Sequence, residues 1–264
     1  MSEGFWRTGI TDVKPGEIRI QGYSIQDLIK HASFGDVVFL LFKGEWPLHG
    51  EGRLVEAILV SSADHSLAAP SADATRLVAS CGVPLPSAVA AGVLAIGDYH
   101  AGAIEGCART LLEGLSDEET DLGKAAAILV NAARERKERI LGYGHPVHKT
   151  DPRVTALFEI AHELKLDSRW VPFALEVEKA LEEKTGRHLP LNVDGAIAAL
   201  LLEMGMDWRV GKAFFVISRS AGLAAHYLEQ VSRERPFKAA KYNEIIYDGP
   251  PPRDLPVVRK EKER

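Results

Sequence analysis

Five ionisable side chains stand where the surrounding sequence predicts burial: His65, His100, His145, Asp194 and Arg219. His65 ends an apolar helical run, His100 lies at a junction rich in small residues, and Asp194 directly precedes the apolar stretch GAIAALL. Arg219 falls among Phe, Val, Ile, Ala and Leu in a helical pattern. Burying a charge is costly unless a partner or a ligand compensates it. The occurrence of all five in one chain therefore predicts a polar site inside an apolar globule.

Four of these residues also have a purely structural interpretation. Asp194 stands where the N-cap of the following helix would stand. His65 and His100 can be hydrogen-bonded core histidines. His145 can serve a turn, because it lies between a glycine and a proline.

Arg219 has a structural alternative too, an ion pair with a carboxylate such as Glu178 or Glu229. A metal site has weak support, because a proline lies between His145 and His148, which have the spacing of a shared ligand pair. The motifs G-x-S-x-G, G-x-x-x-x-G-K-[ST] and G-x-G-x-x-G are absent from the sequence. The serine hydrolase, P-loop and dinucleotide-binding classes are therefore excluded at the motif level.

The stretch GYGHPVHKTDPR at 142–153 concentrates two glycines, two prolines, two histidines, a lysine and an arginine. Glycines let a ligand approach the backbone closely, and Lys149 and Arg153 supply cations for anionic groups. Pro152 is well suited to the first turn of a helix. The stretch predicts an anion-binding loop that leads into a helix.

The composition of the 264 residues bounds the class of protein. With 46% hydrophobic residues the chain can bury a sizeable core. A net charge of −5 without a basic stripe argues against a nucleic-acid partner. We expect no signal peptide and no membrane span, because no apolar run is long enough. Cys81 and Cys107 form no C-x-x-C pair, so we expect a reduced, cytoplasmic protein.

Helical periodicity dominates the chain, and an alternating β-α-β pattern is missing. Residues 17–23 predict a short strand or hairpin arm ahead of the helices. We therefore predict an all-α globule of roughly ten helices. The tail at 251–264 is rich in proline and charge, and we expect it to be flexible.

In its motifs and their order, the chain resembles the citrate synthase superfamily over about residues 8–249. The loop at 142–153 is similar to the family's G-[FY]-G-H-x-V-x-K-x-D-P-R motif. The other similar segments, in chain order, are ADHSL, DYHAGAIEG, LNVDGAIA and SRSAGLAAHYLEQ. The join GEWPLHGEGRLVEAILVSSADH is much shorter than in citrate synthases. It resembles the join in citryl-CoA lyases, both free-standing and as the C-terminal module of ATP-citrate lyase.

The resemblance implies a role for each matched residue. His100 would donate a hydrogen bond to the thioester oxygen, Asp194 would move the proton at the acetyl methyl, and His145 would face the keto or hydroxyl oxygen. The residues implied to bind substrate carboxylates are His65, Arg153 and Arg219. The residues implied to contact coenzyme A are Gly142, Tyr143, Gly144 and Lys149.

The activity implied is cleavage of citryl-CoA to acetyl-CoA and oxaloacetate. The alternatives are a citrate synthase or related enzyme that condenses an acyl-CoA with a 2-oxo acid, and a non-catalytic CoA-binding regulator. Synthases carry a partner-subunit arginine in a P-R-x-x-Y-x-G tail, and Glu244 stands in that place here. This departure favours the lyase, and Arg235 and Arg253 are candidate substitutes for the missing arginine.

The resemblance also implies a citrate synthase-like fold with a large domain and a reduced small domain. Residues 1–250 would form one catalytic unit, with a small-domain-like part at about 142–218 inserted in the large domain. A homodimer or higher homo-oligomer is implied, with the helices around 86–115 as interface material. The coenzyme A thioester would be a substrate, and no metal or permanently bound cofactor is implied.

Overall fold

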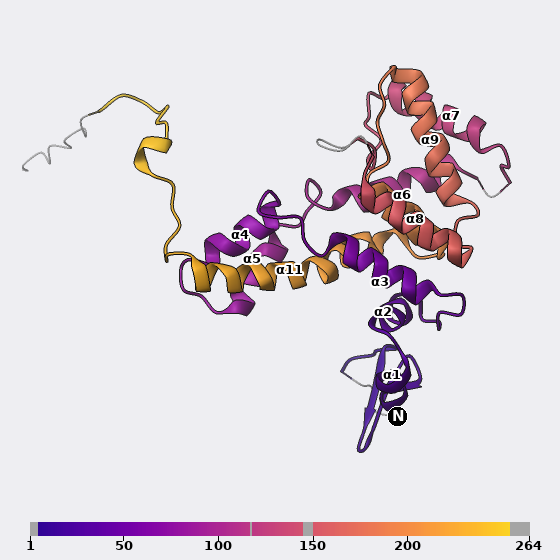
Figure 1. Ribbon diagram of the computed structural model, residues 1–264, viewed down its shortest axis with the longest axis horizontal. Helices are drawn as coiled ribbons and strands as arrows, with labels where there is room; N and C mark the ends of the chain where they lie inside the picture. Colours follow the sequence, from indigo (N-terminus) through magenta and orange to yellow (C-terminus); the bar gives the residue numbers. More distant parts are fainter. Residues whose placement is uncertain (1–4, 117, 145–149, 254–264) are drawn as a thin grey trace, which may run out of the picture.

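The computed structural model of the chain describes residues 5–116, 118–144 and 150–253. In these residues it contains eleven α-helices and one small sheet of three short strands (Figure 1), which confirms the all-α class. The helices are α1 (Ile25–His31), α2 (Phe34–Lys43), α3 (Glu51–Ser62), α4 (Pro70–Ala79), α5 (Leu85–Leu94), α6 (Gly102–Gly114), α7 (Leu122–Glu135), α8 (Pro152–Leu164), α9 (Trp170–Thr185), α10 (Val193–Glu203) and α11 (Gly211–Arg233). Two 3-10 turns, η1 (Trp208–Val210) and η2 (Tyr242–Glu244), flank α11.

The strands form an antiparallel meander at the N-terminal end. β1 (Thr11–Lys14) pairs with β2 (Glu17–Ile20), and β2 pairs with β3 (Tyr23–Ser24). The strand expected within residues 17–23 is therefore confirmed. In Figure 1 the meander and α1 project from the helical body, so they take no part in the cavity described below.

Helix α10 lies at the centre of the core. Nine of its eleven residues are buried, and α6, α8 and α9 pack against it. Its sequence VDGAIAALLLE is apolar on all sides after the first turn, as expected for a helix that is buried all round. The first turn of α10, which carries a charge, therefore lies beside the loops at the N-terminal end of the helix.

Helix α11 connects two parts of the structure. Along its length it packs against α3 and α6, and against α4 and α5, and Figure 1 shows α4 and α5 as an arm beside its C-terminal half. Leu223 joins Ala69 and Ala72 in a small apolar cluster under this arm. Residues near the middle of α11, including Arg219, consequently lie where the arm meets the body.

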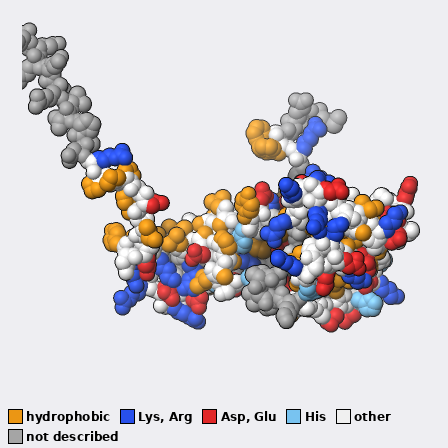
Figure 2. Space-filling view, turned by 90° about the horizontal axis from the view of Figure 1, so that it is seen from above, with side chains coloured by type: hydrophobic (Ala, Val, Ile, Leu, Met, Phe, Trp, Pro, Cys, Tyr) orange, Lys and Arg blue, Asp and Glu red, His pale blue; other side chains and the backbone are white. Residues whose placement is uncertain are grey.

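The arm and the chain beyond it carry exposed apolar side chains. Figure 2 shows hydrophobic side chains gathered on the arm and on the segment that leaves it. Residues 234–253 are all exposed and run away from the body in Figure 1. The large apolar residues exposed on α4, α5, α11 and this segment include Leu77, Leu94, Leu228, Val231, Phe237, Tyr242, Ile246 and Tyr247.

Candidate active site

One cavity of about 300 Å³ brings together six of the predicted site residues, namely Gly144 and five ionisable residues. These five residues come from five separate segments: the loop after α3, the turn before α6, and helices α8, α10 and α11. They are His65, His100, Arg153, Asp194 and Arg219. Two further predicted residues, His145 and Lys149, lie outside the described residues.

Asp194 lies in the first turn of α10 but does not cap that helix. The side chain of Asn192 is the cap, and it accepts hydrogen bonds from the backbone N–H groups of Asp194 at 3.0 Å and Gly195 at 3.2 Å. The structural alternative for Asp194 is therefore wrong, and Asp194 lines the cavity. Burial raises the pKa of Asp194, and the nearby positive charges of Arg153 and Arg219 offset this only in part.

His100 is held in a tight turn between α5 and α6. Its backbone exchanges two 3.0 Å hydrogen bonds with Gly97, and its ring meets that of Phe215 edge to face, with centroids 5.4 Å apart. Burial, and then the charge of Arg219, lower the pKa of His100, which favours the neutral imidazole. Nε2 lies 2.9 Å from Ser71 Oγ. When the serine hydroxyl donates to Nε2, the ring proton sits on Nδ1 and is available as a donor.

Arg219 is a buried cation, 3% exposed, in the middle of α11. Its Nε donates to the carbonyl oxygen of Ser62 at 3.0 Å, and its Cζ lies 4.7 Å from the centre of the Phe215 ring. Nη1 is buried without a hydrogen-bond partner among the described residues. Glu178 and Glu229 bond elsewhere, so the alternative of an ion pair with either is wrong. A buried donor without a partner is costly, and a carboxylate ligand would satisfy it.

Arg153 is the second residue of α8 and is held by Asp151, a residue to which the sequence pattern assigned no role. Asp151, whose side chain is fully buried, caps α8 and accepts hydrogen bonds from the Arg153 side chain. Asp151 also accepts from the backbone N–H of Val193 at the start of α10. Ser71 was missed in the same way, because it acts on His100 across 29 positions of sequence. The only sequence signal for Asp151 was its place inside the matched D-P-R motif.

The described part of the 142–153 loop is fastened to the start of α10. Asn192 N donates to Gly142 O at 3.0 Å, Gly144 N donates to Pro190 O at 2.7 Å, and Asn192 Nδ2 donates to Gly144 O at 3.0 Å. Asn192 therefore both caps α10 and holds the loop. This joins two of the sequence motifs in one local structure beside Asp194.

Gly142 and Tyr143 are predicted to contact coenzyme A together with Gly144, but both are packed into the core. Tyr143 is 6% exposed and its hydroxyl donates to Ala174 O in α9 at 3.0 Å. Gly142 is packed so tightly that an added Cβ would lie 2.7 Å from Cys107 Sγ and 2.8 Å from Gly195 Cα. Both residues therefore anchor the loop in the core, whereas Gly144 lines the cavity. Tyr143 also lines a second cavity, which it shares with Gly144.

A second cavity, of about 670 Å³, adjoins the first and shares Gly144 with it. Among the described residues, five cationic side chains line it, together with apolar residues of α7 and α9. They are Arg134, Lys137, Arg139, Lys184 and Arg187. We call this cavity the basic groove. No sequence motif predicts the basic groove, because its cations are spread over two segments.

Two structural features are absent from residues 5–116, 118–144 and 150–253. No group of three or more His, Cys, Asp or Glu side chains there is placed to hold a metal ion. No helix there is long and apolar enough to cross a membrane.

The sequence pattern of the citrate synthase C-terminal domain matches residues 48–240, which include every described residue of the cavity. The chain belongs to the citrate synthase family. The structure of citryl-CoA lyase from Hydrogenobacter thermophilus is similar, with 43% sequence identity, a TM-score of 0.89, and coverage of 96% of this chain and 98% of that chain.

Two less similar proteins are longer than this chain. ATP citrate lyase from Methanothrix soehngenii, solved with citrate and coenzyme A, shares the fold at 24% identity and a TM-score of 0.81, over 95% of this chain and 43% of that chain. A probable ATP-citrate synthase from Caenorhabditis elegans is 32% identical over 92% of this chain and 23% of its own length. The chain thus spans about a quarter of that relative's length.

Proposed function

We propose that this member of the citrate synthase family is a citryl-CoA lyase, which cleaves citryl-CoA to acetyl-CoA and oxaloacetate. The observation that carries the proposal is the buried Arg219, whose Nη1 lacks a partner among the described residues and which lines the same cavity as Asp194 and His100. A free guanidinium donor suits a substrate carboxylate. The similarity to a citryl-CoA lyase at 43% identity over nearly the whole chain supports the same activity.

The chemistry begins at the tertiary hydroxyl of citryl-CoA. His145, assigned by its motif, takes the hydroxyl proton, the oxygen forms the keto group of oxaloacetate, and the adjacent C–C bond breaks. The electron pair of that bond passes to the thioester, whose oxygen becomes negative. A neutral His100 donating from Nδ1 stabilises this oxygen. A donor aimed at developing charge acts mainly in the transition state.

The last step is the transfer of a proton from Asp194 to the methylene carbon, which gives the methyl group of acetyl-CoA. Burial raises the pKa of Asp194, so its carboxyl group holds a proton more readily than an exposed aspartate. In the opposite direction the same carboxylate takes a proton from the acetyl methyl. Asp194 therefore suits general acid and base roles alike.

The coenzyme A part of the substrate would occupy the basic groove. Its phosphates need several cations, and five line the groove. Because Gly144 lines both cavities, a ligand can pass from the groove over this glycine and place its thioester beside His100. Lys149, also assigned by its motif, would add a further cation. We propose that the part at about 142–218 acts as the small domain that closes over this ligand.

The deciding experiment separates the two directions of the chemistry. The purified protein is mixed with citryl-CoA, and separately with acetyl-CoA and oxaloacetate, and oxaloacetate and free thiol are measured. Oxaloacetate from the first mixture without thiol release supports the lyase. Thiol release from the second mixture indicates the synthase instead, and no reaction in either overturns the proposal.

A matched pair of arginine variants tests the carboxylate site itself. Arg219→Leu should abolish the rise in melting temperature that citrate produces in the wild type, because the buried donor is lost. Arg209→Leu removes an arginine whose side chain is 73% exposed and paired with Asp207, and it should retain the full citrate effect. Equal citrate effects in both variants would contradict the placement of the carboxylate.

We also propose that two copies of the chain form a homodimer, through the arm and the exposed segment at 234–253. Contiguous exposed apolar side chains on a folded protein mark an interaction surface, and here they follow α5, α11 and the segment beyond. Sedimentation at micromolar concentration should give a dimer, and a monomer would contradict the proposal.

We also propose a cytoplasmic location. Both cysteines are free thiols, which agrees with this location.

A further inference from the structure

One face of α11 holds the end of α3 and the loop at 63–69, which carries His65. Four residues of α11 contact this segment in register, one after another along the helix. The pairs are Ser218 Oγ with Leu59 O, Arg219 Nε with Ser62 O, Gly222 with Ala63 O, and His226 Nε2 with Asp64 Oδ1. The helical residues recur at intervals of one, three and four positions, so they share one face of α11.

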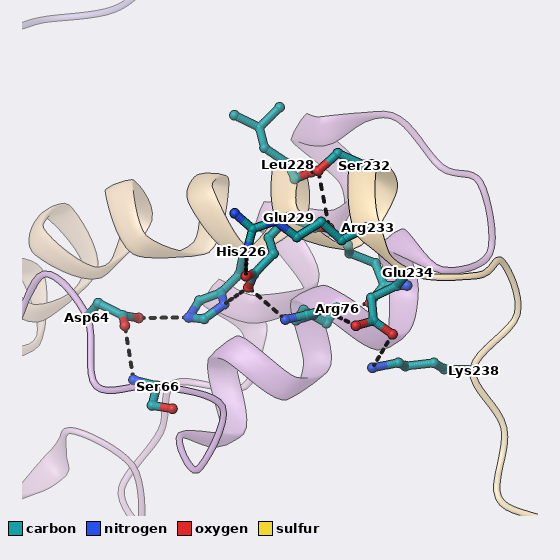
Figure 3. A network of polar contacts seen from close by, with 11 residues as sticks. Asp64, Ser66, Arg76, His226, Leu228, Glu229, Ser232, Arg233, Glu234 and Lys238 are labelled. Atoms are coloured by element: carbon teal, nitrogen blue, oxygen red, sulfur yellow. Dashed lines mark hydrogen bonds and ion pairs between the residues drawn. The ribbon is translucent and has the colours of Figure 1, made fainter.

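Asp64 holds the loop around His65 through two contacts of its carboxylate. Its Oδ1 lies 2.9 Å from His226 Nε2, and its Oδ2 accepts a hydrogen bond from the backbone N–H of Ser66 at 3.0 Å. Figure 3 shows Asp64 pointing toward His226, with Ser66 below it. Ser66 has a φ of +62°. This conformation costs an L-residue free energy, and it persists only where the surrounding contacts hold it. The Asp64 carboxylate supplies that restraint next to His65.

The His226 ring is itself held from the far side. Its Nδ1 lies 3.9 Å from Glu229 Oε2, and that carboxylate oxygen accepts from Arg76 Nη1 at 2.9 Å. Arg76 is 4% exposed and also donates from Nε to Gln230 Oε1 at 3.1 Å. Figure 3 shows this chain of contacts from Asp64 through His226 to Arg76. The His226 ring therefore lies between Asp64 and the Glu229–Arg76 pair, and its Nε2 can hold Asp64 in one place.

We infer that His226 and Asp64 are positioning residues that hold the loop so that His65 faces the substrate carboxylate. Neither residue lines the cavity, whereas His65 does. The inference rests on the proposed function for its kinetic test, since that test uses citryl-CoA. Its second test measures the loop directly and needs no substrate.

The kinetic test compares three variants of the full-length protein. His226→Leu should raise KM for citryl-CoA about tenfold, as expected for a misplaced hydrogen bond to a charged group, and should change kcat less than about twofold. His226→Gln should restore KM, because its amide N–H can reach Asp64. His162→Leu is the matched control, since His162 forms a 2.8 Å pair with Asp167 away from the cavity, and it should leave KM unchanged.

A double-mutant cycle separates positioning from a general loss of stability. His65→Ala should raise KM about tenfold on its own. If His226 acts through His65, adding His226→Leu to His65→Ala should raise KM no further. Multiplied effects in the double variant would overturn the inference.

Hydrogen exchange of the peptide that covers 63–69 gives the direct test. Its amides should exchange at least about tenfold faster in His226→Leu than in the wild type, and at the wild-type rate in His226→Gln. Unchanged exchange in His226→Leu would overturn the inference. If the wild type fails to cleave citryl-CoA, the proposed function falls, and the exchange result alone still decides whether His226 holds the loop.

Discussion

Asp151 accepts two parallel hydrogen bonds from Arg153, from Nε to Oδ1 at 2.9 Å and from Nη2 to Oδ2 at 2.7 Å. The carboxylate is fully buried while the arginine side chain keeps 25% of its surface exposed. Oδ2 also accepts from Val193 N at 3.2 Å. One buried carboxylate thus fixes a cation that lines the cavity and the residue directly before Asp194. Burial alone would raise the pKa of Asp151, but the hydrogen bonds from Arg153 outweigh it and hold this pKa below its usual value.

Replacing Asp151 with asparagine should destabilise the protein by about 2 kcal/mol at pH 7, because a buried ion pair loses its anion. Since the folded pKa of Asp151 lies below the unfolded one, its contribution is present above about pH 4 and is lost as pH falls through the folded pKa. Urea unfolding at pH 7 and pH 3 would show the difference shrinking.

The exposed pair of Asp207 and Arg209 has the same two-residue spacing and the same fork of hydrogen bonds, from Nε to Oδ1 and from Nη2 to Oδ2. Asp207→Asn is therefore the control, and its urea midpoint should match the wild type. Equal midpoints for Asp151→Asn and Asp207→Asn would show that burial of Asp151 adds nothing to the fold.

Asp194 should show the opposite sign, since burial raises its folded pKa above the unfolded value. Its stabilising contribution is then complete below about pH 4 and is lost as pH rises through the folded pKa, because ionising the buried carboxyl group costs stability. Asp194→Asn should stabilise the protein by about 1 kcal/mol and lower citryl-CoA cleavage at least about a hundredfold. Urea unfolding and oxaloacetate release measure the two effects.

The exposed Asp98, paired with Lys212 at 2.7 Å, provides the control for Asp194. Asp98→Asn should gain no stability at pH 7. An Asp194→Asn variant that is less stable than the wild type would contradict the raised pKa, and one that keeps its activity would remove Asp194 from the mechanism.

Ala101 is strained at the N-cap of α6, where it adopts a left-handed φ of +76° beside His100. The similar family motif has glycine at this position, and glycine adopts that conformation without strain. Ala101→Gly should therefore stabilise the protein by about 0.5–1 kcal/mol. Ala91→Gly, inside α5, should instead destabilise it by about 1 kcal/mol. Chemical unfolding of both variants compares them, and a loss of stability in Ala101→Gly would show that the methyl group is needed for packing.

The sequence predicted the helical class and most of the cavity, because both depend on signals within short segments. Helical periodicity alone indicates an all-α fold, and an isolated Arg219 in an apolar helix already indicated a ligand or a partner. The pattern left Asp194 open between an N-cap and a site residue. The structure decided it, since Asn192 two positions earlier takes the capping bonds. His65 was expected at a helix end, but α3 ends at Ser62 and leaves His65 in a loop.

The parts that could not be predicted depend on contacts between distant segments. The contact of Ser71 with His100 spans 29 positions, and the contact of His226 with Asp64 spans 162. Ser71 lies outside the matched segments, and the two segments that contain Asp64 and His226 do not indicate that these residues pair. Tertiary packing alone creates both contacts. The basic groove is a similar case, since α7 and α9 bring its cations together.

Two glycines of the same loop provide a last prediction, because the sequence assigned both to coenzyme A and the structure separates them. Both have positive φ, +86° at Gly142 and +88° at Gly144. An alanine Cβ at Gly142 would press on Cys107 and on Gly195 of α10. At Gly144, among the described residues, it would meet only Leu189, at 3.7 Å. Gly142→Ala should thus destabilise the protein by about 3 kcal/mol, from overpacking and backbone strain together.

Gly144→Ala should cost only about 1 kcal/mol, from backbone strain alone. It should also raise KM for citryl-CoA severalfold, because Gly144 lines both the cavity and the basic groove, where a methyl group would obstruct the ligand. Urea unfolding measures the first difference, and steady-state kinetics at a temperature where both variants are folded measures the second. Equal destabilisation by the two substitutions would mean that α6 and α10 can move apart around Gly142. An unchanged KM in Gly144→Ala would mean that the ligand follows another path into the cavity.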